Sequence, residues 1–208
     1  AKVPAYIAAQ VVAAIVASSI VYLVYFEQIE YVEQLAQTQA IKNAQALPVV
    51  TQEGLEIQVE VMDGRRTMAT AGIFATYPRE FDEQNRVTNW TGLLDQFVGT
   101  ALLLLVICAV VDKKNAGPDF SLAPIAIGAV VMMIGMGFGA NCGYAVNPAR
   151  DFGPRLFTFM AGWGSLVFLE PDNFWYLVPI IGPLLGGVAG VAAYDQLITR
   201  FHPDDDDD

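Results

Sequence analysis

Hydrophobic and polar positions along the chain separate into long uncharged stretches joined by polar connections. Residues 3–26, 120–140 and 174–194 contain no Asp, Glu, Lys or Arg. A fourth apolar stretch, 93–111, carries Asp95 as its single charged residue. A helix needs about 20 largely apolar residues to cross the hydrocarbon core of a bilayer. The pattern therefore predicts an all-α membrane protein with about four spanning helices.

The segment between the first two predicted spans, 27–92, is polar. Residues 27–47 contain helix formers throughout and predict a polar continuation of the first helix to about residue 46. Residues 55–61 (LEIQVEV) alternate apolar and polar side chains and precede an Asp-Gly pair, which is compatible with a short strand or hairpin and equally with an irregular loop. Residues 71–92 are expected to form a polar loop.

A shorter helix is predicted within 139–173, where Gly and Pro interrupt an apolar stretch. Asn147 and Pro148 favour a helix start, because Asn caps free backbone amides and Pro suits the first helical position. A helix from Asn147 to Phe159 would be only about 20 Å long, which is too short to cross a bilayer. We therefore predict a re-entrant half-helix, whose irregular flanks need protein or a water-filled cavity beside them.

Composition supports this class and argues against others. Of the 208 residues, 54% are hydrophobic, and the net charge of −11 comes largely from 27–92 and from the run Asp204–Asp208. That run is expected to be disordered, as a native tail or as an expression tag. An acidic balance without a basic stripe argues against a nucleic-acid partner. We expect no cofactor, no metal and no enzyme activity, since the single histidine, His202, lies near the end of the chain.

The distribution of basic residues predicts the topology. If the short connection that contains Lys113 and Lys114 is cytoplasmic, as the positive-inside rule requires, residues 27–92 lie outside. A half-helix that turns back also puts Arg200 and the C-terminus in the cytoplasm. The segments are then a spanning helix (1–26), a long extracellular loop (27–92), a second half with its spans and half-helix (93–198), and an acidic cytoplasmic tail (199–208).

The half-helix carries the candidate chemistry. Arg150 at the bilayer centre would cost about 2.5–3.5 kcal/mol, so it is expected beside water. The helix N-terminus adds unpaired amides and partial positive charge, and Asn147 adds an amide donor. These groups predict a constriction that repels cations and selects neutral hydroxylated solutes. A Gly-rich lead-in is expected to be extended, with its carbonyls facing the same path; it comprises Gly135, Gly137, Gly139 and Gly143.

The sequence GYAVNPARDFGPR at 143–155 resembles the second signature loop of the major intrinsic protein (aquaporin) family, in its aquaglyceroporin branch. TAGIFATYP at 70–78, LLDQFVGTALLLLVICAVVD at 93–112 and RLFTFMAGWGSLVF at 155–168 resemble segments of animal glycerol channels. The resemblance implies an aquaporin-like helical bundle that is incomplete, because only the third helix and the second half have counterparts. The N-terminal half, with its own signature loop, is expected from a longer protein or a companion chain.

The resemblance also implies residue roles. Asn147 would donate a hydrogen bond to the permeant, with Pro148 and Ala149 packed where two half-helices meet. A selectivity filter would consist of the Arg150 guanidinium, the Tyr144 ring and, where strict water channels have His, Gly135. A ladder of carbonyl acceptors and two supporting residues complete the implied set: Asn141, Cys142, Gly143 and Ala145 for the ladder, and Asp151 and Gln96 for support.

We therefore predict a passive channel for glycerol, water and other small neutral solutes such as urea, in the plasma membrane and as a homotetramer. The alternatives are a broken-helix secondary transporter, which would need a coupling-ion site, and a structural or adhesion protein. Trp163, Trp175 and Tyr176 are expected in an interfacial aromatic belt. The sequon at Asn89 is expected to stay unmodified, and His202 to be a solvated bystander rather than a pH sensor.

Overall fold

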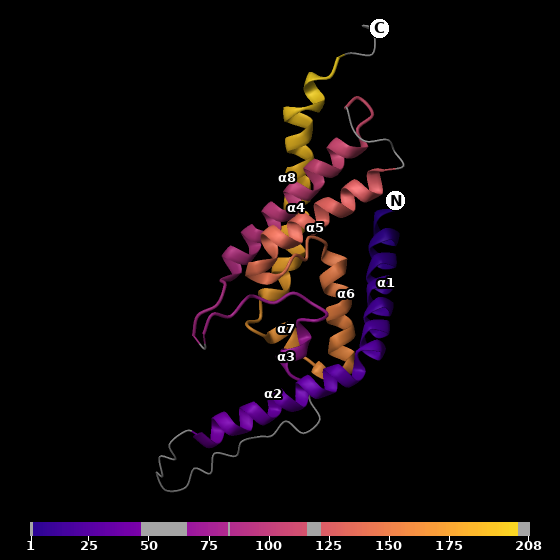
Figure 1. The fold of residues 1–208 in the computed structure, drawn as a ribbon. Coiled ribbons are helices and arrows are strands. Elements are labelled where there is room, and N and C mark those ends of the chain that lie inside the picture. The colour runs from indigo at the N-terminus through magenta and orange to yellow at the C-terminus, as the bar shows by residue number, and fades with distance from the viewer. Residues whose placement is uncertain (1, 47–65, 83, 116–121, 204–208) are drawn as a thin grey trace. The chain divides into compact units, whose positions relative to one another are not determined.

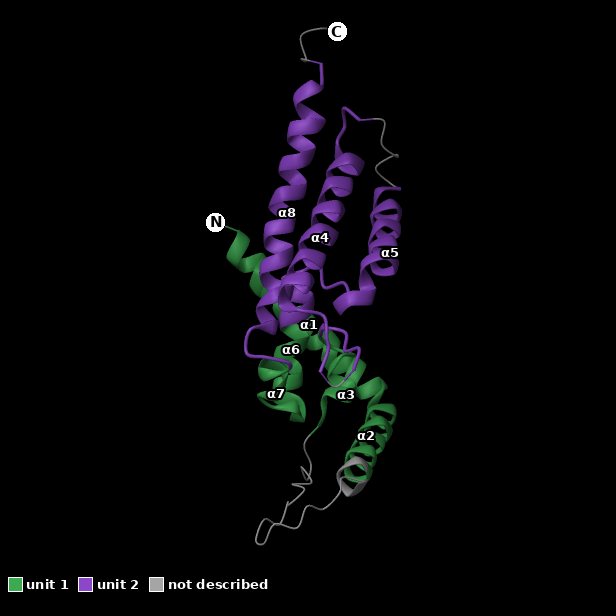
Figure 2. Cartoon of the chain, turned by 90° about the vertical axis from the view of Figure 1, so that its left-hand side faces the viewer, with its two compact units in different colours: residues 1–75, 153–170 green, residues 76–152, 171–208 purple. Residues whose placement is uncertain are grey.

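The computed structural model describes residues 2–46, 66–82, 84–115 and 122–203. The chain divides into two compact units (Figure 2), of which the first contains Ala1–Ala75 and Gly153–Glu170 and the second contains Thr76–Phe152 and Pro171–Asp208. Regular structure in the described residues is helical, with one isolated bridge between Glu80 and Arg86. The interpretation of 55–61 and the expected disorder of the tail concern residues outside the described ranges.

The second unit is built on three long helices, α4, α5 and α8 (Figure 1). Their bounds are Asn89–Val111, Ala123–Cys142 and Val178–Leu197, and short 3₁₀ turns, Trp175–Leu177 and Thr199–Phe201, flank α8. α4 and α8 lie side by side, as both views show. Their backbones touch, because a Cβ at Gly186 or Gly190 would lie 2.2 Å from a carbonyl oxygen of α4. Close contact through small residues is typical of helices packed in membranes.

Two boundaries in this unit differ from the predicted ones. α4 begins at Asn89 rather than near residue 93, because the Thr88 hydroxyl accepts a hydrogen bond from Thr91 N (3.2 Å) and caps the helix there. α5 continues to Cys142 and ends where Gly143 adopts a φ of 75°. The prediction of an extended lead-in from Gly135 is therefore wrong, since an apolar helix tolerates the glycines of this stretch.

Within the described ranges, four helices are long and apolar enough to cross a membrane: Val3–Val24, Asn89–Val111, Ala123–Cys142 and Trp175–Phe201. They confirm the four predicted spans. α6, Pro148–Thr158, has 11 residues, which is about 16 Å at 1.5 Å per residue. Its length is that of a half-helix, so the predicted combination of four spans and one short helix is confirmed.

The first unit contains α1 (Val3–Val24), α2 (Phe26–Ala46), α3 (Met68–Ala71), the C-terminal part of α6, a π-helical turn (Phe159–Trp163) and α7 (Leu166–Leu169). The predicted polar continuation to residue 46 is helical, but it is a separate helix. Tyr25 has φ −105° and ψ 15°, and α2 leaves α1 at an angle there (Figure 1). α1 also contacts α6 closely, because a Cβ at Gly153 would lie 2.6 Å from Ala14 Cβ.

Buried contacts hold the loop that follows α2, so the expectation of a purely polar loop is wrong. Glu33, which is 3% exposed, accepts hydrogen bonds from Thr67 N (2.8 Å) and from the Thr70 hydroxyl. Phe74 packs edge-on against Trp163, with ring centroids 5.5 Å apart. Trp163 and Trp175 are 2% and 0% exposed, so their assignment to an interfacial belt is also wrong.

Candidate functional site

The site begins at Asn147, which caps the N-terminus of α6. Its side-chain Oδ1 accepts a hydrogen bond from Ala149 N (2.9 Å), and its carbonyl accepts one from Arg150 N (3.1 Å). This is the capping geometry that the Asn-Pro pair predicted. Asn147 is exposed, and its Nδ2 group donates to no other residue in the described part of the chain. The amide nitrogen can therefore donate to a solute.

Non-helical backbone connects α5 to this cap. Gly143 and Val146 both have positive φ, 75° and 42°. A β-branched residue rarely adopts such a conformation, and strain of this kind gathers at functional sites where surrounding contacts hold it. Here Val146 N donates to Oε1 of Gln96 (3.1 Å), which fixes the strained residue from α4.

Gln96 makes the contacts expected of a residue that supports this loop. Its side chain is 1% exposed, and Nε2 donates to the Gly143 carbonyl (2.9 Å) while Oε1 accepts from Val146 N. One amide therefore brackets the loop at both ends. Two predicted ladder residues, Asn141 and Cys142, lie in the last turn of α5, and the Asn141 carbonyl accepts a hydrogen bond from Arg79 N (2.8 Å).

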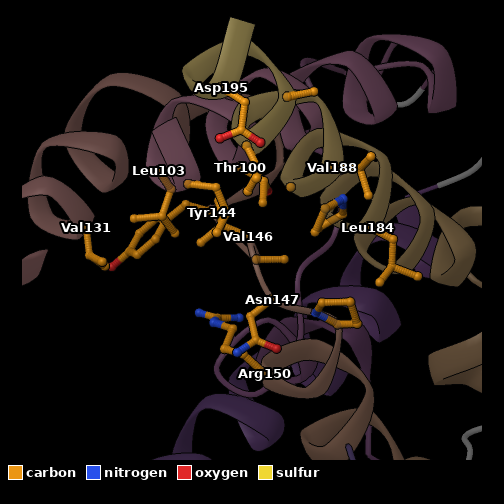
Figure 3. A pocket seen from close by; sticks show the side chains of 17 residues that line it. Thr100, Leu103, Val131, Tyr144, Val146, Asn147, Arg150, Leu184, Val188 and Asp195 are labelled. Atoms are coloured by element: carbon orange, nitrogen blue, oxygen red, sulfur yellow. The ribbon is translucent and has the colours of Figure 1, made fainter. Parts of the chain in front are cut away.

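A cavity of about 890 Å³ opens beside the loop, within the second unit. α4, α5 and α8 contribute mainly apolar side chains to its lining, and the loop and the start of α6 contribute Tyr144 to Pro148 and Arg150. Figure 3 shows Asn147 and Arg150 together on one side of this cavity and Asp195 at a distance from them. The predicted donors therefore face an accessible space.

The three predicted filter residues are neighbours. A Cβ at Gly135 would lie 2.9 Å from Tyr144 Cζ, so the ring occupies the space that a side chain on α5 would fill. Arg150 Cζ lies 5.9 Å from the centroid of the same ring, within the range of a cation–π interaction. Among the described residues, no carboxylate lies within ion-pairing distance of Arg150, so its guanidinium remains a donor toward the cavity.

Asp151, next to Arg150, is turned into the protein and is 0% exposed. Its Oδ2 accepts hydrogen bonds from the Thr76 backbone N (2.7 Å) and from the Thr76 hydroxyl. The Thr76 carbonyl accepts from Trp175 Nε1 (2.9 Å). The sequence analysis did not identify Thr76 as a site residue, because nothing in the polar pattern of 71–92 marks it as buried. The one available signal is its position in TAGIFATYP, the segment that resembles glycerol channels.

Two smaller clusters concern residues considered from the sequence. Asn89 Nδ2 donates to Asp172 Oδ1 (3.0 Å), and Arg86 Nη2 lies 2.6 Å from the other carboxylate oxygen. Partial burial opposes ionisation of Asp172, but hydrogen bonds from Phe174 N and from the Arg86 and Asn89 side chains lower its pKa overall. The side-chain amide of Asn89, the first residue of α4, is thus engaged by Asp172.

The second cluster involves His202, which was expected to be a solvated bystander. Its Nε2 lies 3.6 Å from Asp112 Oδ2, and its side chain is 15% exposed. Hydrogen bonds from Lys114 N and from the Tyr194 hydroxyl lower the pKa of Asp112. The bystander assignment is therefore wrong, because His202 packs against the end of α4.

Comparison with known proteins assigns the chain to a family. The model of the major intrinsic protein family matches residues 1–194. Aquaporin-10 of Homo sapiens is 44% identical over 135 residues, 65% of this chain and 43% of that protein. Aquaporin-10 of Milnesium tardigradum is 37% identical over 214 residues, 97% of this chain and 45% of that protein. The chain thus spans about half the length of the curated relatives it matches.

Among solved structures, the X-ray structure of the aquaglyceroporin from Plasmodium falciparum is similar, with a TM-score of 0.66 and 28% sequence identity. The similarity covers 96% of this chain and 65% of that one. The family match, the aquaporin-like fold and the four apolar helices lead to one conclusion. The chain is a multi-pass membrane protein that belongs to the major intrinsic protein family.

Proposed function

We propose that the protein is a passive transmembrane channel for glycerol, water and other small neutral solutes. The observation that carries this proposal is the cavity onto which Asn147, Tyr144 and Arg150 open. Its donors belong to the N-terminus of a helix too short to span a bilayer. The relatives named aquaporin and aquaglyceroporin support the same assignment.

The chemistry of these groups suits a polyol. The Arg150 guanidinium and the Asn147 amide can each donate to a hydroxyl, and the ring of Tyr144 offers an apolar surface to the carbon chain of glycerol. The carbonyls of the proposed ladder, such as that of Ala145 in the cavity lining, would accept hydrogen bonds from the hydroxyl groups of the solute. The positive end of α6 and the guanidinium together disfavour cations at the same place.

Several features of the complete protein belong to the proposal. The third helix and second half present here would line one part of the pore, and a first half of the same channel would complete it. We propose a homotetramer in the plasma membrane, with 27–92 extracellular and the C-terminus cytoplasmic, since Lys113 and Lys114 then follow the positive-inside rule. No catalytic step and no cofactor are part of the mechanism.

The test is solute flux in liposomes that contain the full-length protein, measured by light scattering after an osmotic step. We expect fast glycerol permeation that does not saturate with glycerol concentration. Arg150→Ala should lower the ratio of glycerol to water permeability, because it removes a donor from the constriction. Arg200→Ala is the matched control, because Arg200 is not in the cavity lining; this variant should keep the permeability ratio of the unsubstituted protein. Saturable, ion-coupled uptake would instead support a secondary transporter.

A further inference from the structure

Asp95 has a buried carboxylate to which the proposed function assigns no role. It lies in α4, inside a predicted membrane span, and is 7% exposed. An ionisable residue in such a position is costly and usually has a functional reason. Asp95 is not in the lining of the cavity, so its reason is not direct contact with a solute.

The contacts of Asp95 lead to the loop that carries Tyr144. Its Oδ1 accepts a hydrogen bond from Asn141 Nδ2 (2.8 Å). Its Oδ2 accepts from Gln96 Nε2 (3.3 Å) and from the Cys142 thiol (3.5 Å). Three donors that adjoin or bracket the loop therefore converge on one carboxylate.

All three contacts of Asp95 are accepted by its carboxylate oxygens, whereas each amide has a donor end and an acceptor end. Asp95 therefore selects the orientation of the Gln96 amide, with Nε2 toward the Gly143 carbonyl (2.9 Å) and Oε1 toward Val146 N (3.1 Å). The reversed amide would present a donor to a donor at Val146. Asp95 also holds the side chain of Asn141, whose carbonyl accepts from Arg79 N (2.8 Å).

We propose that Asp95 is a positioning residue that sets the selectivity of the channel for glycerol over water. It acts through Gln96, whose amide holds both ends of the strained segment Gly143–Val146, and through Asn141 in the last turn of α5. These contacts fix the ring of Tyr144 beside Arg150. Glycerol must contact several pore groups at the same time, whereas a water molecule needs fewer contacts. A more mobile loop should therefore lower the permeability to glycerol more than the permeability to water. This inference rests on the proposed function.

The experiment compares Asp95→Ala, Asn141→Ala and the double variant in liposomes that contain the full-length protein. The quantity measured is the ratio of glycerol to water permeability in the same vesicles, because a smaller folded fraction lowers both permeabilities equally. We expect Asp95→Ala to lower this ratio about threefold or more, given the loss of buried hydrogen bonds at one carboxylate. The double variant should match Asp95→Ala, since the Asn141 contact is already lost there.

Asp112→Ala is the matched control. Asp112, the C-cap residue of α4, also has a hydrogen-bonded carboxylate, but its partners are Tyr194 and Lys114 rather than the loop, so the ratio should not change. If Asp95→Ala fails to fold, Asp95→Asn carries the test; it exchanges one acceptor oxygen for a donor and should shift the ratio in the same direction by less.

Amide hydrogen exchange at Val146 provides a readout that does not depend on glycerol. We expect faster exchange at this amide in Asp95→Ala than in the unsubstituted protein and in Asp112→Ala. Equal losses of both permeabilities, or unchanged exchange at Val146, would overturn the positioning role. An unsubstituted protein that passes no glycerol would instead contradict the proposed function, and the exchange measurement would still decide the role of Asp95 in holding the loop.

Discussion

At the residue scale, the lack of a side chain at Gly135 decides where the ring of Tyr144 can lie. A Cβ at this position would come within 2.9–3.2 Å of three ring atoms, closer than packed atoms tolerate. The same ring lies under the Arg150 guanidinium. A single glycine on α5 therefore controls the relative position of an apolar surface and a cationic donor, the two features that a polyol needs together.

Gly135→Ala tests this dependence. The added methyl group must displace the Tyr144 ring, and overpacking of this kind costs about 1–3 kcal/mol. We expect a lower melting temperature and a larger fall in glycerol than in water permeability, and a still larger effect for Gly135→His. Gly137→Ala is the control, because nothing lies within 4 Å of its Cβ position. Equal losses for both solutes in Gly135→Ala would contradict the assignment of Gly135 and Tyr144 to the filter.

At the element scale, the residue that caps α6, Asn147, has two roles. Asn147 Oδ1 caps the helix through Ala149 N, while Nδ2 is available to a solute. The two ends of one amide thus have separate tasks. A substitution that keeps the acceptor end and removes the donor end can separate them.

Asn147→Asp is that substitution, because Asp and Asn are about equally good N-caps. We expect Asn147→Asp to retain the thermal stability of the protein but to lose most of its glycerol permeability, since a carboxylate replaces the donor. Asn147→Ala should lose both, with about 1 kcal/mol of stability from the missing cap. Melting temperature in detergent and flux in liposomes give the two quantities. Full glycerol flux in Asn147→Asp would show that Asn147 is only a cap.

The pairing of α4 with α8 rests on glycines that let the two backbones touch. The Cβ position at Gly190 lies 2.2 Å from the Ala101 carbonyl oxygen, whereas at Gly187 the nearest atom, Leu104 Cγ, lies 3.8 Å away. We expect Gly190→Ala to force the helices apart and to lower the melting temperature strongly. Gly187→Ala should leave it nearly unchanged. Similar melting temperatures for the two variants would show that this contact adds little to stability.

At the scale of the whole molecule, the features that sequence predicts are those with a local cause. The spans follow from uncharged length, and the start of α6 follows from the Asn147-Pro148 pair. The break between α1 and α2 at Tyr25 contains no Gly or Pro that would predict it. The burial of Thr76 and Trp163 depends on contacts with residues distant in the sequence. Asp95 could be singled out as a charge in an apolar stretch, but its partners from α5, Asn141 and Cys142, become apparent only when α4 and α5 pack together.

Long-range ion pairing also determines how the molecule should respond to acid. Asp172 bonds to Arg86 and Asn89, more than 80 positions earlier in the sequence, and its pKa is lowered in the folded protein. Such a carboxylate stabilises the fold above its unfolded pKa of about 3.9, and this contribution is lost as the pH falls through the lower folded value. We expect the melting temperature in detergent to fall as the pH drops below about 4.

Asp172→Asn isolates the contribution of this ion pair. The variant should be less stable than the unsubstituted protein at pH 6, and the difference should shrink as the pH falls below the unfolded pKa of about 3.9 and through the lower folded value. Glu170→Gln removes an exposed carboxylate two residues earlier and should preserve the pH dependence of the unsubstituted protein. If the melting temperatures of Asp172→Asn and Glu170→Gln depend on pH in the same way, the contact of Asp172 with Arg86 and Asn89 does not depend on the charge of Asp172.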